Sequence, residues 1–293
     1  MSDDYQPDRE VRFLAGVDPD EVDAYVRRLM SESEIAPSKY ALPREYLSVS
    51  QVTMFQRCPR QYYFRYIENL VLPPGVAMAE GSAMHRALEH ALHAKQQNDI
   101  LPVDTLVDVF RARWKSEDEI VFDDEKGENE NMIFARSRVF LSQYRQDFLP
   151  VIDPIEIEQR FVVSLVPGIP VVGFIDLIDR GEEDRIDTVV DHKVTGRMKS
   201  AHEVENDMQL TLYAHVKKLP KVRFDVFLKN KKPTIKSLSA VRKPGDIRWV
   251  QHVFREVAES ITMGRFPPCD PKSYSCALKS CGYYHRCREA INV

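Results

Sequence analysis

The sequence has no run of about 18 consecutive apolar residues, which is close to the length that a helix needs to cross a membrane, so we expect no membrane span. It has no glycine followed by lysine and then serine or threonine, so the phosphate-binding loop of ATP-driven motors is missing. We also find no internal repeat. These absences exclude a membrane-spanning protein, a repeat protein and a chain that carries its own ATP motor.

Charge of one sign does not dominate either. The 293 residues include 41 Lys and Arg against 45 Asp and Glu, a formal net charge of −4, so no overall basic field indicates nucleic acid. Charge is nevertheless uneven, since residues 117–130 are strongly acidic and residues 217–236 carry eight basic side chains against one acid, Asp225. Such a basic stretch can bind phosphates, although a solvated surface would explain it equally well.

Cysteine is scarce, and the count of five is odd. Because the chain opens with polar residues and no apolar signal region, we expect no disulfides and a cytoplasmic location. Cys58 is far from Cys276, Cys281 and Cys287, which are spaced C-x4-C-x5-C among polar residues. Four thiolates could hold an iron–sulfur cluster. Tetrahedral zinc and unliganded buried thiols remain alternatives, and Cys269 is left over as a free thiol.

Hydrophobic periodicity predicts an α/β protein. Ser48 or Ser50 should cap a short helix that runs towards Cys58. A period of 3.6 predicts helices at about residues 19–33, 81–97, 103–118, 130–148, 201–218 and 246–263. A period of two predicts strands at 155–165, 170–179, 185–194, 221–229 and 234–240, with a turn at 180–183 between the second and third. This order places one mixed sheet between helices.

Charged residues end two of the predicted strands. Since alternate side chains of a strand share a face, Asp191 and Lys193 should point together and His192 away from them. Asp176 ends the preceding strand in the same way, so the two strands can bring Asp176 and Asp191 together. Adjacent carboxylates repel unless they share a proton or a cation, and oxygen ligands favour Mg²⁺ or Mn²⁺. A buried Asp–Lys ion pair with a turn-capping Asp176 would explain the same residues.

Two predicted helices add polar residues next to apolar ones. His85 lies at the border of the apolar face of the helix at 81–97, where a lone histidine is more often a core residue. Gln209 and Tyr213 share a face with Leu212, so Gln209 is a polar group on a buried stripe and needs a partner.

In this order the motifs resemble the RecB-like branch of the PD-(D/E)XK nucleases, which includes the AddB nuclease domain, CRISPR-associated adaptation exonucleases and phage recombination exonucleases. The resemblance covers about residues 46–290. The matching segments are Cys58-Pro59, Gly81-Ser82-Ala83-Met84-His85, Gly173-Phe174-Ile175-Asp176, Asp191-His192-Lys193, Gln209-Leu210-Thr211-Leu212-Tyr213 and the three terminal cysteines. An acidic accessory segment at 1–45 and a helical insertion at about 100–150 depart from the compact family members.

The resemblance implies an α/β fold with a restriction-endonuclease-like core, a central mixed β-sheet flanked by helices, over residues 46–293. It implies that His85, Asp176 and Asp191 hold Mg²⁺ or Mn²⁺ and that Lys193 assists the attacking water. Gln209 and Tyr213 would lie beside them and contact DNA or the site.

A C-terminal cysteine-rich tail would complete the fold. There Cys276, Cys281 and Cys287 would join Cys58 in binding a [4Fe-4S] cluster, which would clasp the two ends of residues 46–293 together.

We therefore expect a metal-dependent DNA exonuclease that acts on single-stranded or frayed ends in recombination or repair, including a phage setting. Its partners would be DNA and a recombination, single-strand-annealing or helicase protein, in a bacterial or phage-infected cell. The alternatives are a CRISPR-adaptation nuclease that trims DNA, a DNA-binding module that barely cleaves, and a zinc-stapled structural protein.

Overall fold

The structure, a computed structural model, describes residues 19–36, 38–117, 119–122, 127–180 and 186–291. The chain forms two compact units. The first, which we call the sheet unit, comprises Met1–Tyr25, Pro73–Gln159 and Phe174–Lys243. The second, which we call the cysteine unit, comprises Val26–Leu72, Arg160–Gly173 and Pro244–Val293. The predicted division at residue 45 stays a prediction.

The sheet unit is built on a mixed sheet, as the element order predicts. In this unit the part of β3 (Ile169–Asp179) from Phe174 onwards is followed by β4 (Thr188–Thr195), β5 (Lys221–Leu228) and β6 (Thr234–Val241). The end of β3 pairs antiparallel with β4, β4 pairs parallel with β5, and β5 pairs antiparallel with β6. β2 (Pro154–Val166) pairs with β3.

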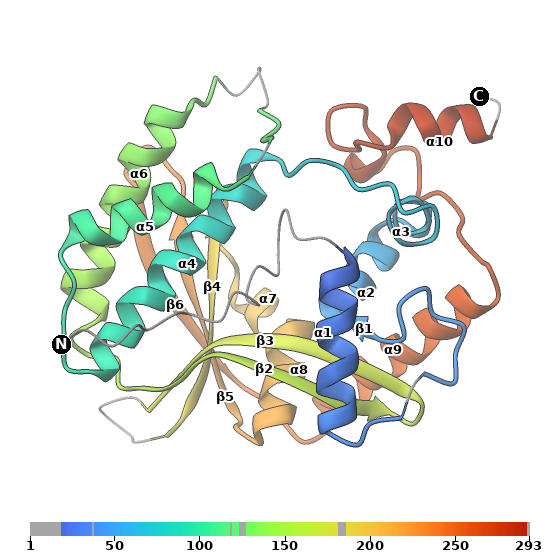
Figure 1. Cartoon of the computed structure of the whole chain (residues 1–293), viewed down its shortest axis with the longest axis horizontal. Helices are drawn as coiled ribbons and strands as arrows, with labels where there is room; N and C mark the ends of the chain where they lie inside the picture. Colours follow the sequence, from blue (N-terminus) through green and yellow to red (C-terminus); the bar gives the residue numbers. More distant parts are fainter. Residues whose placement is uncertain (1–18, 37, 118, 123–126, 181–185, 292–293) are drawn as a thin grey trace. The chain divides into compact units, whose positions relative to one another are not determined.

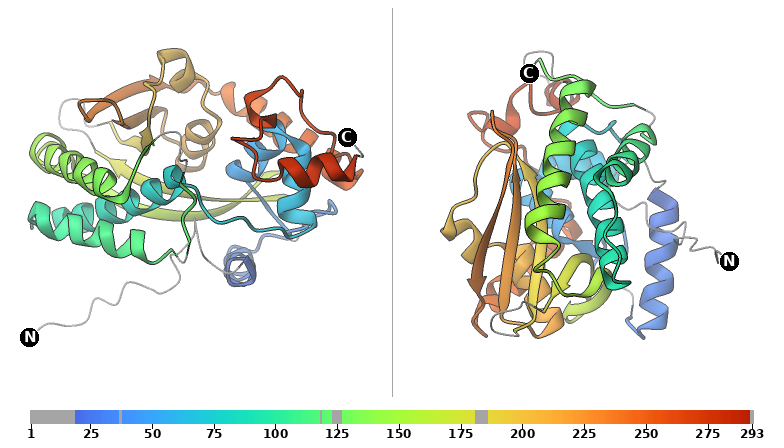
Figure 2. Two further views of the ribbon diagram at one scale, coloured as in Figure 1. Left: turned by 90° about the horizontal axis from the view of Figure 1, so that it is seen from above. Right: turned by 90° about the vertical axis from the view of Figure 1, so that its left-hand side faces the viewer.

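Helices cover this sheet. α4 (Val76–Gln96), α5 (Val103–Lys115) and α6 (Glu130–Gln143) lie together on one face, as Figures 1 and 2 show. α7 (Ala201–Glu205) packs near β6, and α8 (Met208–Lys217) packs against β4 and β5. The predicted helical insertion therefore supplies one side of the core.

Strand alternation decides what each face of β4 carries. Val190 lies in the apolar core formed with α4, α5 and α6, together with Leu177 of β3 and Phe227 of β5. Since neighbouring residues of a strand point to opposite faces, Asp191 projects from the other face, towards α8. The fold thus assigns apolar and charged side chains of one strand to different sides of the sheet.

The cysteine unit begins with a short parallel pairing between β1 (Leu47–Ser48) and the start of β3. Ser48 caps α2 (Val49–Arg57) by accepting a hydrogen bond from the Gln51 amide, as predicted. Further along come α3 (Pro59–Tyr62), a π-helical turn (Tyr63–Ile67), α9 (Asp246–Thr262), a 3₁₀ turn (Tyr274–Cys276) and α10 (Tyr284–Ala290).

Cys58 occupies the junction between α2 and α3. Its extended backbone (φ −163°) ends one helix and begins the next, and Pro59 stands in the first turn of α3, where a missing N–H costs nothing.

Several predicted boundaries need correction. The helix expected at 201–218 is two helices, because the side chain of Asp207 accepts a hydrogen bond from the Leu210 amide and starts α8 anew. The helix expected at 130–148 ends at Gln143 and continues as a π-helical turn, Tyr144–Phe148. α4 begins five residues earlier than the predicted start at 81, and α3 with its π-helical turn was not predicted.

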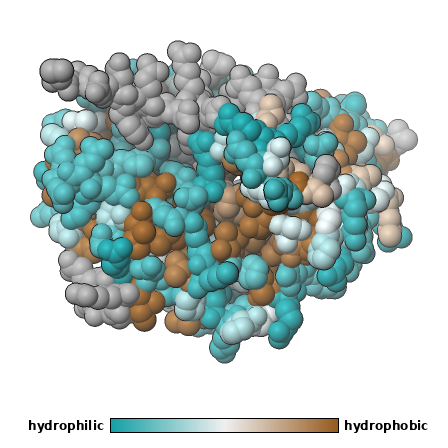
Figure 3. All heavy atoms as spheres, turned by 60° about the horizontal axis from the view of Figure 1, so that its bottom comes forward, coloured by the Kyte–Doolittle hydropathy of each residue, from teal (hydrophilic) through white to brown (hydrophobic). Residues whose placement is uncertain are grey.

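Some expectations fall outside the described residues, namely residues 1–18 of the accessory segment, residues 118 and 123–126 of the acidic stretch, and residues 181–183 of the predicted turn. α1 (Pro19–Glu32) confirms the helix predicted near the start. Among the described helices, none combines the length and the hydrophobicity that crossing a bilayer requires. On the face drawn in Figure 3, hydrophobic side chains form patches separated by hydrophilic ones, which is usual for folded proteins.

Candidate functional site

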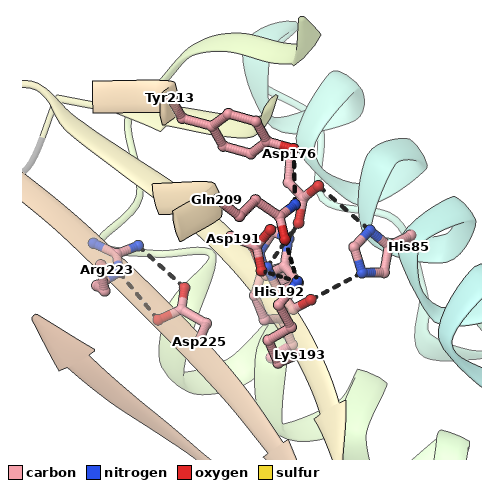
Figure 4. Close-up of polar contacts among 10 residues, drawn as sticks. His85, Asp176, Asp191, His192, Lys193, Gln209, Tyr213, Arg223 and Asp225 are labelled. Atoms are coloured by element: carbon pink, nitrogen blue, oxygen red, sulfur yellow. Dashed lines mark hydrogen bonds and ion pairs between the residues drawn. The ribbon is translucent and has the colours of Figure 1, made fainter. Parts of the chain in front are cut away.

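Asp191 and Lys193 share a face of β4, as alternation predicts, and form an ion pair with 2.8 Å between Lys193 Nζ and Asp191 Oδ2. Lys193 Nζ also donates a hydrogen bond to Gln209 Oε1 of α8 at 3.1 Å. The amide of Gln209 then donates to the hydroxyl of Tyr213 at 2.7 Å, one turn further along the helix. Figure 4 shows these side chains, which form one connected chain between β4 and α8.

His85 of α4 meets Asp176 of β3 at the same place. Nδ1 of His85 lies 3.5 Å from Asp176 Oδ1, while Nε2 lies 2.9 Å from the backbone oxygen of His192. The backbone N–H of His192 donates to Asp176 Oδ2 at 2.7 Å. The main chain of β4 at His192 is therefore the common support of both side chains (Figure 4).

Mutual attraction shifts the pKa of both groups. Burial lowers the pKa of His85, but the charge of Asp176 and a hydrogen bond to it, with smaller effects of Glu158 and Asp191, raise that pKa to about 9. Burial raises the pKa of Asp176, yet His85 and His192 outweigh this effect and hold it well below its usual range. Without a metal, the pair is thus a buried imidazolium and carboxylate.

Asp191 is the least satisfied group of the site. Its side chain is buried, and neither carboxylate oxygen has a hydrogen-bond partner within the part of the chain that the structure describes. The ammonium of Lys193, 2.8 Å from Oδ2, is the cation that this carboxylate faces. Burial, reinforced by the charge of Asp176 and opposed by Lys193, raises the pKa of Asp191 to about 6. A buried carboxylate without donors is costly unless a cation binds it.

Glu158 of β2 is a site residue that sequence reasoning missed. One ligand atom each from His85, Glu158 and Asp176 lie within 4.8 Å of one another. Glu158 follows Ile155-Glu156-Ile157 in an alternating pattern, so the sequence suggests only a solvent-facing strand residue. Its backbone is instead left-handed (φ 48°) in the middle of the strand. This conformation is unfavourable for a residue with a Cβ and typically marks a bulge that re-aims a side chain at a functional site.

Burial raises the pKa of Glu158 well above its usual range, and the charge of Asp176 raises it further while His85 lowers it. The site thus gathers three carboxyl groups and one imidazole, of which Asp176 and Asp191 stand on neighbouring strands. Carboxylate oxygens together with one ring nitrogen are ligands that suit Mg²⁺ or Mn²⁺. The residues therefore fit the divalent cation that the resemblance implies.

His192 projects into the opposite side of the sheet, as predicted, but it still touches the site. Its ring Nδ1 lies 3.5 Å from Asp176 Oδ2, and its Nε2 lies 3.4 Å from the hydroxyl of Tyr144. His192 and Tyr144 are both buried. They support Asp176 from the apolar side.

Ion pairs within the protein neutralise part of the charge of the basic stretch at 217–236. Arg223 contacts Asp225 through Nε at 3.0 Å and Asp179 through Nη1 at 2.8 Å, as Figure 4 shows in part. Lys217 pairs with Glu156, and Lys229 Nζ lies 2.9 Å from Glu80 Oε2. By contrast, the stretch leaves exposed lysines at positions 218, 231, 232 and 236.

In the cysteine unit, one cavity is lined by all five cysteines, Cys58, Cys269, Cys276, Cys281 and Cys287. The structure thus brings Cys58 together with the three cysteines of the tail, and it adds Cys269, which sequence reasoning left over. None of the five forms a disulfide in the structure.

A polar side chain from α3 also enters this cavity. The amide of Gln61 donates to the sulfur of Cys281 at 3.3 Å and to the backbone oxygen of Ser275 at 3.0 Å.

Comparison with known proteins gives one decisive match. A family model described as the PD-(D/E)XK nuclease superfamily matches residues 46–288. No curated protein matches the chain.

Two solved structures are similar over most of their length. The protein SSO0001 shares 12% identity at a TM-score of 0.36, covering 80% of this chain and 82% of its own. A candidate exonuclease from Eubacterium rectale shares 10% identity at a TM-score of 0.46, covering 82% of this chain and 87% of its own. Both scores are too low to support an argument.

The pKa of His85 predicts how stability depends on pH without metal. Because the pKa rises from 6.5 unfolded to about 9 folded, the contribution of His85 is complete below pH 6.5 and is lost as pH rises through 9. It amounts to at most about 3 kcal/mol. Urea denaturation in EDTA should show the free energy of unfolding falling over this range. His85→Gln should remove that slope, whereas the matched change at the exposed His252 should keep it.

Proposed function

The chain belongs to the PD-(D/E)XK nuclease superfamily, and on that premise we propose that it is a metal-dependent deoxyribonuclease that removes nucleotides from DNA ends. The observation that carries this proposal is the buried Asp191 carboxylate, which among the described residues faces only the ammonium of Lys193, together with the nearby group of His85, Glu158 and Asp176. A purely structural ion pair would satisfy its own oxygens.

We assign the cation to His85, Glu158, Asp176 and Asp191. When bound, Mg²⁺ or Mn²⁺ would supply Lewis-acid activation of water and neutralise charge on the scissile phosphate. Glu158 extends the set of His85, Asp176 and Asp191 that the resemblance implies.

The other site residues then act on the water and the phosphate. Lys193 presents an ammonium held between Asp191 and Gln209, where it orients the attacking water and stabilises negative charge that develops on the phosphate. Gln209 and Tyr213 hold Lys193 in place through their hydrogen bonds. His192 and Tyr144 fix the carboxylate of Asp176.

We further propose that the substrate is single-stranded DNA or a frayed duplex end. The chain has no phosphate-binding loop for ATP and therefore no motor to separate strands. Exposed lysines at positions 231, 232 and 236, around the connection of β5 to β6, can contact phosphates. Membership of the RecB-like branch and a role in recombination or repair, beside a helicase or annealing protein, follow from the same resemblance.

The cavity of five thiols supports a second part of the proposal, a [4Fe-4S] cluster in the cysteine unit. Thiolates are the ligands of such clusters, and the Gln61 N–H to Cys281 is the kind of contact that stabilises ligand sulfur. Joining Cys58 to the tail would restrict the unfolded chain over about 230 residues.

Protein purified without air should contain iron and acid-labile sulfide and absorb visible light. Zinc in place of iron would contradict this assignment.

The nuclease proposal is tested with DNA labelled separately at its 5′ and 3′ ends, in single-stranded and duplex form. Wild type should release label with Mn²⁺ or Mg²⁺ and not with EDTA. Asp191→Ala should reduce the rate by on the order of 10³-fold or more while DNA binding remains, because it removes a group that acts in the transition state. A variant that still cuts would refute this site. Wild type that binds DNA without cutting would favour the DNA-binding module.

Glu158 has a matched control two residues away on the same strand. Glu158→Gln should weaken Mn²⁺ binding and slow cleavage by roughly tenfold or more, since it removes a negative ligand beside His85 and Asp176. Glu156→Gln should leave both unchanged, because Glu156 pairs with Lys217 instead. Mn²⁺ titration by calorimetry and the labelled-end assay measure the two effects. Equal behaviour of the two variants would remove Glu158 from the site.

A further inference from the structure

The thiol cavity holds one more sulfur than a four-coordinate centre needs. A [4Fe-4S] cluster or a tetrahedral zinc takes four protein thiolates, whereas five cysteines line the cavity. The spacing of the cysteines in the sequence does not show which of the five sulfurs is dispensable.

The surroundings of the five sulfurs are unequal. Cys58 is buried at the junction of α2 and α3, and Cys281 is buried and accepts the hydrogen bond from Gln61. Cys287 belongs to α10, and its amide donates to the Tyr283 carbonyl oxygen at 2.8 Å. Three sulfurs are thus fixed by burial or by a helix.

Cys269 and Cys276 differ from these three in their place in the chain, because both lie on the connection between α9 and Cys281; both are half-buried, as Cys287 is. A turn joins them, in which the Ser273 amide donates to the Asp270 carbonyl oxygen at 2.8 Å and the Cys276 amide donates to the Ser273 carbonyl oxygen at 2.9 Å. Burial raises the pKa of the Cys269 thiol to about 12, and hydrogen bonds with the thiols of Cys58 and Cys276 contribute. Cys269 therefore lies against both Cys58 and Cys276, and the turn joins it directly to Cys276.

We propose that Cys269 and Cys276 are alternative ligands for a single position of the metal centre, while Cys58, Cys281 and Cys287 each hold a fixed position. This inference rests on the proposed cluster. The turn carries both sulfurs to the same side of the cavity, so a small rearrangement of an exposed segment exchanges one for the other. The centre then keeps four thiolates when either of the two is lost.

Serine variants test the exchange through metal content, independently of cleavage. Cys269→Ser and Cys276→Ser should each retain more than half of the wild-type iron and sulfide per chain. The double variant should lose iron by roughly tenfold or more, because only three thiolates remain. Cys281→Ser is the matched control, and it should lose iron although four other cysteines are present. Loss of iron in Cys276→Ser alone, or retention in Cys281→Ser, would overturn the exchange.

A measurement on the wild type does not depend on how the variants fold. Iron-loaded protein treated with an alkylating reagent should carry about one label per chain, since four of five thiols are ligands. Mass spectrometry should find that label divided between Cys269 and Cys276. A label on Cys269 alone would overturn the exchange and leave the cluster intact. Wild type without iron would overturn the cluster proposal and the exchange with it, and the nuclease assay would be unaffected.

Discussion

The burial of the Asp191 carboxylate is the constraint on which the site depends. Removing a charge from water is costly, and within the described part of the chain the ammonium of Lys193 at 2.8 Å is what offsets that cost. Lys193 is itself held by Gln209, and Gln209 by Tyr213. The hydrogen-bonded side chains of Lys193, Gln209 and Tyr213 thus lead to this one buried carboxylate.

The sheet explains how such a carboxylate can be tolerated. β4 places Val190 in the apolar core and Asp191 on the opposite face, so one strand serves stability and chemistry at once. His192 connects the two sides, since its main chain contacts Asp176 and His85 while its ring reaches towards the apolar side. The remaining carboxyl group comes from Glu158, whose backbone is left-handed. Unfavourable backbone conformations of this kind are expected to persist at functional sites.

The cysteine unit brings its functional side chains together in a different way. Its thiols are brought together from the junction of two helices and from a tail with little regular structure. A tail of this kind buries few apolar side chains, since Phe64, Cys281 and Tyr283 form only a small cluster. The apolar side chains that α2 and α9 bury belong to the rest of the cysteine unit and not to this tail.

The sequence by itself determined the order of helices and strands, the mixed sheet, and the shared face of Asp191 and Lys193, because periodicity and local spacing act over a few residues. Only the tertiary structure decided the rest. Glu158 joins the site where its backbone is left-handed, a conformation with no sequence signature, and Asp207 divides a helix that periodicity makes continuous. Cys269 enters the thiol cavity because the chain turns back after α9, and no local pattern encodes such a long-range approach.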